Sequence, residues 1–248
     1  MKCAKAWHTG VATEQCAAVC AIRTARDADS MSSRSAFITK ELSRETWDDF
    51  VDLFSRRGGW DHCFCMHFHR PCSLPKDQQL RTRAERGARN CKQKKMLVDG
   101  GRAHGILVYV HDRPVGWCQY GTREELPRID NSRKYRALAF DERKSRALQA
   151  DVRGSGAKPL WRITCFVVDK KYRRQGIATA ALRAALNSIK RESGGIVEAY
   201  PISHWETRAF GNESTSGTLS MFKRQGFKVV APLGATRFSS HVLVRKIV

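Results

Sequence analysis

Residues 165–179 read Cys-Phe-Val-Val-Asp-Lys-Lys-Tyr-Arg-Arg-Gln-Gly-Ile-Ala-Thr, and this stretch decides the fold. Its β-branched and aromatic start predicts a strand, and the spacing of apolar residues from Ala178 onward predicts a helix. The first N–H groups of a helix have no partner within the helix, and together with the helix dipole they suit a pyrophosphate. Gly176 lets phosphate oxygens approach the backbone, and Arg173 and Arg174 add charge-assisted contacts.

The turn resembles motif A of the GNAT acetyltransferases, written Arg/Gln-x-x-Gly-x-Gly/Ala, which follows the fourth strand in that family. Residues 173–178, Arg-Arg-Gln-Gly-Ile-Ala, fit every position. Residues 221–227, Met-Phe-Lys-Arg-Gln-Gly-Phe, are similar to the family's helix-to-strand signature that ends in Gly-Phe. The resemblance covers roughly Ile106 to Val248 without an insertion at about 122–158, and also the helices from Phe37 onward.

A smaller resemblance concerns the segment from Trp60 to Arg70, followed by Pro114 to Cys118. It is similar to a subgroup of uncharacterised bacterial GNAT proteins with a Cys-aromatic-Cys-Met sequence. The resemblance to that subgroup implies no particular substrate.

The family resemblance implies a fold, a cofactor and a reaction. The fold is α/β, with a mixed, mostly antiparallel central sheet flanked by helices. The implied enzyme is an N-acetyltransferase that moves an acetyl group from acetyl-CoA directly to an amine of a small molecule or peptide in a ternary complex. By the same likeness, backbone groups of Phe166 to Val168 pair with the pantetheine arm, N–H groups of Arg174 to Thr179 bind the pyrophosphate, and the Val167 N–H polarises the thioester carbonyl. The implied cofactor-binding residues are Phe166, Val167, Val168, Arg173, Arg174, Gln175, Gly176, Ile177, Ala178 and Thr179, and no metal is expected.

The acceptor amine attacks only as the free base, and a lysine-like amine is about 0.1% neutral at pH 7. Period-two alternation places Glu198 on one strand face with Ile196 and Tyr200, beside the point where the cofactor strand should diverge. Glu198 is therefore our first candidate for the general base. His204, Glu206 and the absence of a protein base are alternatives, and a paired or solvated carboxylate is the other interpretation of Glu198.

The acid that protonates the leaving thiolate is less defined. Many family members have a tyrosine four positions before the Gly of the Gly-Phe pair, where this chain has Phe222. Phenylalanine donates no proton, so the role is empty or falls to Tyr200, Ser220 or water. A thiolate is already a fair leaving group, so transfer does not require this acid.

Six side chains of the types that bind zinc lie within eleven residues: His62, Cys63, Cys65, His67, His69 and Cys72. Their spacing matches no closed two-plus-two arrangement. Alternating Phe64, Met66 and Phe68 fit one buried face of an irregular strand equally well. We expect the segment to form a wall of the acceptor pocket rather than a metal site.

The rest of the pattern predicts one main domain at 36–248, with a basic insertion at about 122–158 beside the core. Residues 1–35 are interpreted as disordered or as an upstream extension. The predicted helices span 44–57, 76–95, 135–150, 178–193 and 218–224. The predicted strands span 106–110, 115–120, 161–168, 196–200, 227–230 and 242–247.

The composition limits the kinds of partner that we expect this protein to bind. A formal net charge of +21 concentrates anions near the surface. Coenzyme A is one such anion, and another acidic partner such as a nucleic acid is possible. Two alternative functions therefore stay open: a transferase that acts on transfer RNA or a ribosomal component, and a degenerate module that only binds acyl-CoA. No apolar run reaches the roughly 18 to 20 residues that span a bilayer. We expect a cytoplasmic protein with reduced thiols and no membrane partner, compatible with a homodimer.

Overall fold

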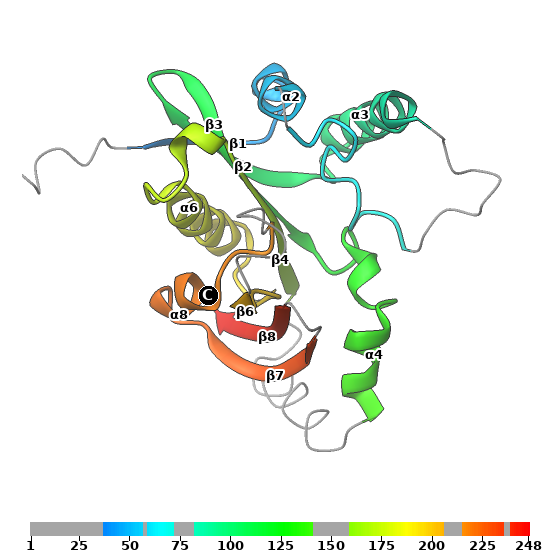
Figure 1. The fold of residues 1–248 in the computed structure, drawn as a ribbon, viewed down its shortest axis with the longest axis vertical. Coiled ribbons are helices and arrows are strands. Elements are labelled where there is room, and N and C mark those ends of the chain that lie inside the picture. Colours follow the sequence, from blue (N-terminus) through cyan, green and yellow to red (C-terminus); the bar gives the residue numbers. More distant parts are fainter. Residues whose placement is uncertain (1–36, 57–58, 72–81, 141–158, 206–214, 236–238) are drawn as a thin grey trace, which may run out of the picture. The chain divides into compact units, whose positions relative to one another are not determined.

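The computed structural model describes residues 37–56, 59–71, 82–140, 159–205, 215–235 and 239–248. The unit Phe37–Val248 is built on one eight-stranded sheet in the order β1-β2-β3-β4-β5-β8-β6, with β7 paired to β8 (Figure 1). Neighbouring strands are antiparallel except β4 and β5, which are parallel. The predicted mixed, mostly antiparallel sheet is therefore confirmed.

The strands are β1 (Ile38–Glu41), β2 (His104–Val110), β3 (Arg113–Thr122), β4 (Leu160–Val168), β5 (Ile196–Ala199), β6 (Ile202–Trp205), β7 (Lys228–Ala235) and β8 (Ser239–Ile247). The α-helices are α2 (Trp47–Ser55), α3 (Arg83–Asp99), α4 (Arg133–Phe140), α6 (Ile177–Glu192) and α8 (Leu219–Arg224). Two short 3-10 helices, η2 (Pro127–Ile129) and η3 (Lys170–Tyr172), complete the described elements.

Helix α6 covers one face of the sheet. Its buried side chains, among them Ala181, Leu182 and Ala185, recur at helical spacing and pack on strand residues such as Val108 and Tyr120. The start of α6 lies close to β3 at Gly116, where a Cβ atom would come within 2.2 Å of Ile177 Cγ2. A glycine on β3 thus allows the N-terminus of α6 to lie against the sheet.

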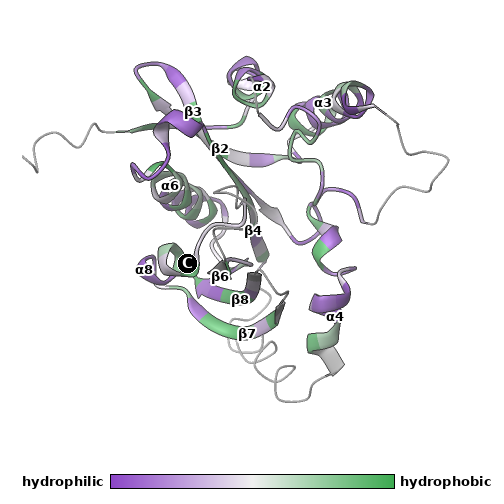
Figure 2. Ribbon diagram, in the orientation of Figure 1, coloured by the Kyte–Doolittle hydropathy of each residue, from purple (hydrophilic) through white to green (hydrophobic). Residues whose placement is uncertain are grey.

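Helices α2 and α3 lie on the other face. Phe50 and Phe54 of α2 pack on Trp117 of β3, in a cluster that also contains Leu107 of β2 and Val167 of β4. Hydrophobic residues concentrate where α2 and α6 meet the sheet, whereas much of α3 is hydrophilic (Figure 2). Because helices cover both faces, nearly every residue of β2 and β3 is buried.

The parallel pair β4–β5 separates part of the way along β4. Leu160 to Ile163 pair with Ile196 to Ala199, but β4 continues to Val168 after β5 has ended. A register shift between Gln119 and Tyr120 of β3 accompanies this change, so that Thr164 is skipped in the pairing with β3. The last residues of β4 are thereby left without a neighbouring strand on the β5 side.

Several predicted boundaries differ from the structure. Strands β1 and β6, of four residues each, were not predicted. Helix α3 begins at Arg83 rather than 76, since Thr82 and Glu85 form a reciprocal capping box. Residues 1–36, which include the predicted extension, and 141–158, which include about half of the predicted insertion, lie outside the described residues.

The described part of the predicted insertion packs on the domain. Leu126, Ile129 and Leu138 are buried, and Leu138 joins a small core with Ala231 and Leu243. Residues 126–138 therefore contribute apolar side chains to the packing of the domain, although charged residues are interspersed among them. Of the helices in the described ranges, none has the length and apolar character needed to cross a membrane.

Candidate functional site

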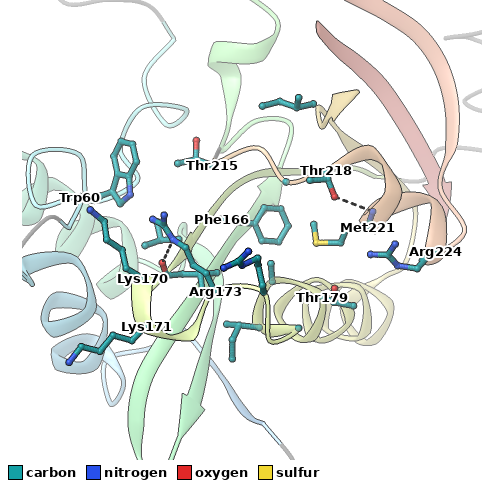
Figure 3. Close-up of a pocket in the computed structure, with 18 residues that line it drawn as sticks. Trp60, Phe166, Lys170, Lys171, Arg173, Thr179, Thr215, Thr218, Met221 and Arg224 are labelled. Carbon is teal, nitrogen blue, oxygen red and sulfur yellow. Dashed lines mark hydrogen bonds between the residues drawn. The ribbon is translucent and has the colours of Figure 1, made fainter. Parts of the chain in front are cut away.

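A cleft of about 1040 Å³ opens where β4 extends beyond β5. Its walls come from the end of β4, the turn into α6, residues 215–218 and helix α8 (Figure 3). The lining residues are Trp60, Phe166, Val167, Val168, Lys170, Lys171, Arg173, Arg174, Gly176, Ile177, Ala178, Thr179, Ile202, Thr215, Gly217, Thr218, Met221 and Arg224. All the predicted cofactor-binding residues except Gln175 are among them.

The turn from β4 into α6 is held in an unusual backbone conformation. Asp169 accepts a hydrogen bond from Lys171 N at 3.0 Å, and its other carboxylate oxygen pairs with Arg56 at 3.1 Å. Arg174 and Gly176 have φ values of 62° and 92°, in the left-handed region that favours glycine. Since Arg174 is not a glycine, its conformation is strained, as is common in ligand-binding loops.

This turn leaves the first amides of α6 available to the cleft. The first intrahelical bond runs from Ala180 N to Gly176 O at 2.9 Å. The N–H groups of Ile177 to Thr179 precede that bond and have no carbonyl within the helix to pair with. They form a cluster of donors at the positive end of a helix of 16 residues.

The cleft is strongly positive. Lys170, Lys171, Arg173 and Arg174 line it from the turn, and Arg224 lines it from α8 (Figure 3). No carboxylate belongs to the described lining residues. Sequence reasoning missed Arg224, although it lies inside the quoted 221–227 signature, because the contact between α8 and the turn is tertiary.

The amides of β4 alternate in direction, and two hydrogen bonds show which way each points. Asp169 N donates to Val115 O of β3 at 2.9 Å, while Phe166 N donates away from β3 to Thr215 O at 2.6 Å. Alternation then directs the Val168 N–H toward the cleft and the Val167 N–H toward β3. The expectation that Val167 polarises a thioester therefore conflicts with this geometry, and Val168 has the orientation that role requires.

Glu198 lies in a buried ionic cluster and does not line the cleft. It is fully buried, and its Oε1 accepts hydrogen bonds from Arg245 Nε at 2.8 Å and Nη2 at 2.6 Å. Tyr135 and Tyr200 donate to its Oε2 at 3.0 and 2.9 Å, and Arg162 Nε is 4.0 Å from Oε2. Because Glu198 is bonded to these donors and does not line the cleft, the paired interpretation of Glu198 fits the geometry better than a general base.

The proton donors considered for the leaving group are also placed away from the cleft. The Tyr200 hydroxyl is committed to Glu198, and burial together with the Glu198 charge raises its pKa well above the usual value. Ser220 is exposed and contacts Thr218 at 3.2 Å. Phe222 is fully buried and packs edge to face against Phe166 and Phe227, which explains an apolar side chain at this position.

Of the described residues of the Cys- and His-rich segment, 60–71, Trp60 alone lines the cleft. Residues 61–69 form successive turns rather than a strand, with hydrogen bonds from Cys63 N to Trp60 O and from Met66 N to Cys63 O, both 2.9 Å. The irregular-strand interpretation is therefore wrong, because Phe64, Cys65 and Met66 are all buried in succession. Among the residues with described positions, no group of three or more His, Cys, Asp or Glu is placed to hold a metal ion. Cys72 and Glu206 lie outside the described residues.

Solved structures similar to this chain include three acetyltransferases. Arabidopsis thaliana NAA60 in complex with acetyl-CoA is 12% identical, with a TM-score of 0.45, and 86% of this chain covers 99% of that one. A GNAT-family acetyltransferase from Streptococcus pneumoniae is 13% identical, with a TM-score of 0.41 and coverages of 86% and 100%. An N-acetyltransferase from Staphylococcus aureus Mu50 is 11% identical, with a TM-score of 0.43 and coverages of 86% and 99%. No curated protein matches the chain significantly.

The family model of the acetyltransferase (GNAT) family matches residues 41–227. The match spans most of the chain and includes β4, the turn, α6 and α8, which together form the cleft. This chain therefore belongs to the GNAT family of acetyltransferases.

Proposed function

We propose that this protein transfers an acetyl group from acetyl-CoA to the amine of a small molecule or a peptide, by direct attack in a ternary complex. The observation that carries the proposal is the cleft of about 1040 Å³, which is lined by five cationic residues and by the first residues of α6. Coenzyme A is a polyanion with a pyrophosphate, and helix N-termini with arginine and lysine are well suited to bind such groups.

The residues present fit this cofactor. The N–H groups of Ile177 to Thr179 and the side chains of Arg173 and Arg174 would hold its pyrophosphate, and Arg224 adds positive charge from the opposite wall. Gly176 carries no side chain at the point where phosphate oxygens would approach the backbone. When bound, acetyl-CoA supplies an activated thioester.

The strand β4 would orient the acyl group. The Val168 N–H faces the cleft without a strand beside it, so it is placed to donate a hydrogen bond to a carbonyl oxygen and to stabilise charge that develops there. The Val168 carbonyl, which accepts a 3.4 Å bond from Arg173 Nε, is held toward the same side. Holding both reactants along this edge supplies proximity, which contributes a large share of the rate in such reactions.

The acceptor amine must lose a proton before it attacks. We propose that Glu198 and Tyr200 fix the position of β5 rather than move this proton, because both are committed to the buried cluster. Deprotonation would then fall to His204, to Glu206 or to water, the alternatives that the sequence left open. A base is identified by its effect on the pH dependence of the rate.

The test combines cofactor binding with turnover. Thermal unfolding is measured with and without acetyl-CoA, and then release of free thiol is followed across a panel of small amines and peptides. We expect acetyl-CoA to raise Tm and at least one amine to accelerate thiol release. If acetyl-CoA leaves Tm unchanged and no amine releases thiol, the proposal fails. Clear stabilisation without turnover on any amine would instead favour a module that only binds acyl-CoA.

An acceptor carried by nucleic acid is a second candidate, favoured by the net charge of +21. Binding to transfer RNA or ribosomal RNA would then weaken steeply with salt, since phosphate contacts release counterions. Acetylation of charged transfer RNA with salt-sensitive binding would support this acceptor class. Binding that is absent at low salt would exclude it.

A further inference from the structure

The cleft has two ends, which lie on opposite sides of the Phe166 ring. One end is lined from α6 and α8, by Thr179, Met221 and Arg224 (Figure 3). The other end is lined by three residues from separate segments, Trp60, Lys170 and Thr215 (Figure 3). The pyrophosphate would occupy the end at α6, so the amine that receives the acetyl group is left with the other. We call Trp60, Lys170 and Thr215 the acceptor end.

Lys170 is presented by a turn that is tied to helix α2. It begins η3, where Asp169 Oδ1 accepts a hydrogen bond from Lys171 N at 3.0 Å. The other oxygen of Asp169 pairs with Arg56, the residue that ends α2, at 3.1 Å. The side chain of Lys170 points toward Trp60, whereas the side chain of Lys171 points away from it (Figure 3).

Trp60 is also held in place. Its carbonyl oxygen accepts hydrogen bonds from Cys63 N at 2.9 Å and from Phe64 N at 3.1 Å. Its ring lies 5.7 Å from the ring of His62 and packs against the hydrophobic cluster between α2 and the sheet. Because Trp60 is only partly buried and lines the cleft, it offers an apolar surface to a ligand beside Lys170.

The acceptor end carries positive charge, and none of the lining residues that the structure describes is a carboxylate. The two carboxylates next to this end along the chain, Asp61 and Asp169, are each paired with an arginine, Arg83 and Arg56. A polycationic amine would therefore meet a lysine here and no counter-charge from the described lining. An amine that also carries an anionic group fits this charge distribution better.

The charge of Lys170 would act on such an acceptor in two ways. It attracts a carboxylate, because an ammonium donates charge-assisted hydrogen bonds to it. It also disfavours the protonated form of a nearby amine, since a like charge lowers the pKa of a base. The acceptor attacks only as the free amine, so the same side chain favours both binding and deprotonation.

We propose that the acceptor is a free amino acid with a large apolar or aromatic side chain, which is acetylated on its α-amine. Lys170 binds its carboxylate, and Trp60 contacts its side chain. This inference rests on the proposed acetyl transfer and names its substrate class. The neutral amine nitrogen attacks the thioester carbonyl carbon, so a C–N bond forms and the C–S bond breaks. The nitrogen loses one proton and the departing thiolate takes up one, which gives the N-acetyl amino acid and coenzyme A.

The first test compares phenylalanine with two analogues that lack its carboxylate, phenylalaninamide and 2-phenylethylamine. Thiol release at saturating acetyl-CoA gives kcat/KM for each amine, and mass spectrometry identifies the product. We expect kcat/KM to be higher for phenylalanine than for either analogue by roughly fivefold or more, the contribution of one ion pair. The amine of phenylalaninamide is the weaker base and is deprotonated to a larger extent, so basicity does not produce this preference.

Variants assign the preference to single side chains. Lys170→Gln should raise the KM for phenylalanine by roughly fivefold and remove the preference over 2-phenylethylamine. Lys223→Gln is the matched control, because Lys223 is an exposed lysine of α8 that does not line the cleft, and it should keep the preference.

Trp60→Leu should lower kcat/KM for phenylalanine relative to alanine by roughly tenfold, because the aromatic contact is lost. Both amino acids are measured on one preparation, so their ratio does not depend on the folded fraction. Calorimetry gives a readout without turnover. With coenzyme A present, phenylalanine should bind more tightly than 2-phenylethylamine, and added salt should reduce the difference.

The outcomes separate this inference from the proposed function. If no amine releases thiol, acetyl transfer itself fails and this inference fails with it. If thiol is released but 2-phenylethylamine, phenylalaninamide or spermidine is preferred to phenylalanine, leucine and alanine, acetyl transfer stands and the amino-acid acceptor is overturned. The same conclusion follows if folded Lys170→Gln keeps the preference for phenylalanine, or if Trp60→Leu leaves the ratio of phenylalanine to alanine unchanged.

Discussion

Thr215 O accepts a hydrogen bond of 2.6 Å from Phe166 N, at the edge of β4 that has no neighbouring strand. The chain thus provides its own partner for one of the cleft-facing amides, and leaves the next one, that of Val168, for a ligand. The position of Thr215 is fixed by the adjoining turn, in which Gly217 has a φ of 71° and its carbonyl accepts from Ile202 N at 3.1 Å.

This relationship predicts an unequal response of neighbouring amides to the cofactor. On addition of acetyl-CoA, the Val168 amide should exchange with solvent more slowly, whereas the Val167 amide should change little because it already faces β3. Hydrogen exchange followed by NMR separates the two. If acetyl-CoA stabilises the protein but newly protects the Val167 amide and not the Val168 amide, the assigned directions of these two N–H groups are wrong.

Replacement of Gly176 tests the turn. Gly176→Ala forces a side chain onto a residue with φ of 92°, which costs about 1–2 kcal/mol, and places a methyl group where phosphate would approach. We expect the Kd for acetyl-CoA to rise by roughly tenfold or more, about 1.4 kcal/mol, by calorimetry. Gly101→Ala is the matched control, since Gly101 has φ of 66° with open space around it and does not line the cleft. Equal loss of affinity in both variants would mean that only stability is affected.

Arg224 supplies the positive charge on the α8 side of the cleft. Arg224→Gln should weaken acetyl-CoA by about 1–2 kcal/mol through loss of a charge-assisted contact, and the salt dependence of Kd should decrease. Lys190→Gln removes an exposed charge elsewhere on α6 and should leave Kd nearly unchanged. An identical effect of the two changes would indicate that general attraction, not contact, governs binding.

Glu198→Gln should destabilise the fold. The variant removes the carboxylate that Arg245 contacts at 2.6 Å, whereas Arg162 keeps its pairing with Asp130 at 2.7 Å. Loss of one partner of a buried ion pair costs about 3 kcal/mol or more. Tm should therefore fall, while the pH profile of acetyl transfer keeps its shape. Glu124→Gln, on the exposed surface, is the control and should unfold like the unaltered chain. A normal Tm with a flattened pH profile would restore Glu198 as the base.

The contribution of His104 to the free energy of unfolding should depend on pH. Burial would lower the pKa of His104, but its hydrogen bond to Glu125 Oε1 at 3.2 Å and the charges of Glu125 and Glu192 outweigh burial and raise the pKa. The protonated form is favoured in the folded state, so this stabilisation is complete below the unfolded pKa and is lost as the pH rises through the folded pKa.

His104→Gln should therefore cost more stability at pH 5.5 than at pH 9, by about 1 kcal/mol for one charge-assisted hydrogen bond. Denaturant unfolding at both values measures the difference. In a Glu125→Gln background the effect of pH on this substitution should be much smaller. A cost that is equal at both pH values in the unaltered background would disprove the role of the ion pair.

The local sequence pattern was sufficient to predict the part of the candidate site that is formed by consecutive residues. The strand, the turn and the start of α6 follow from residues 165–179 alone, because strand propensity, a glycine in the left-handed region and unpaired helix amides are properties of neighbouring residues. Helices α2 and α6 were recognisable for the same reason, since their apolar spacing is local.

Contacts between distant segments required the tertiary structure. The amide of Val167 faces β3 because of the register between β3 and β4, and Glu198 is bonded to Arg245, 47 residues away. The sequence by itself determined the strand, the turn and the helix start at which we propose that a diphosphate binds, since helix-terminal amides are local. Which ionisable groups are paired, and which remain reactive, depended on burial and long-range contacts that only the folded chain creates.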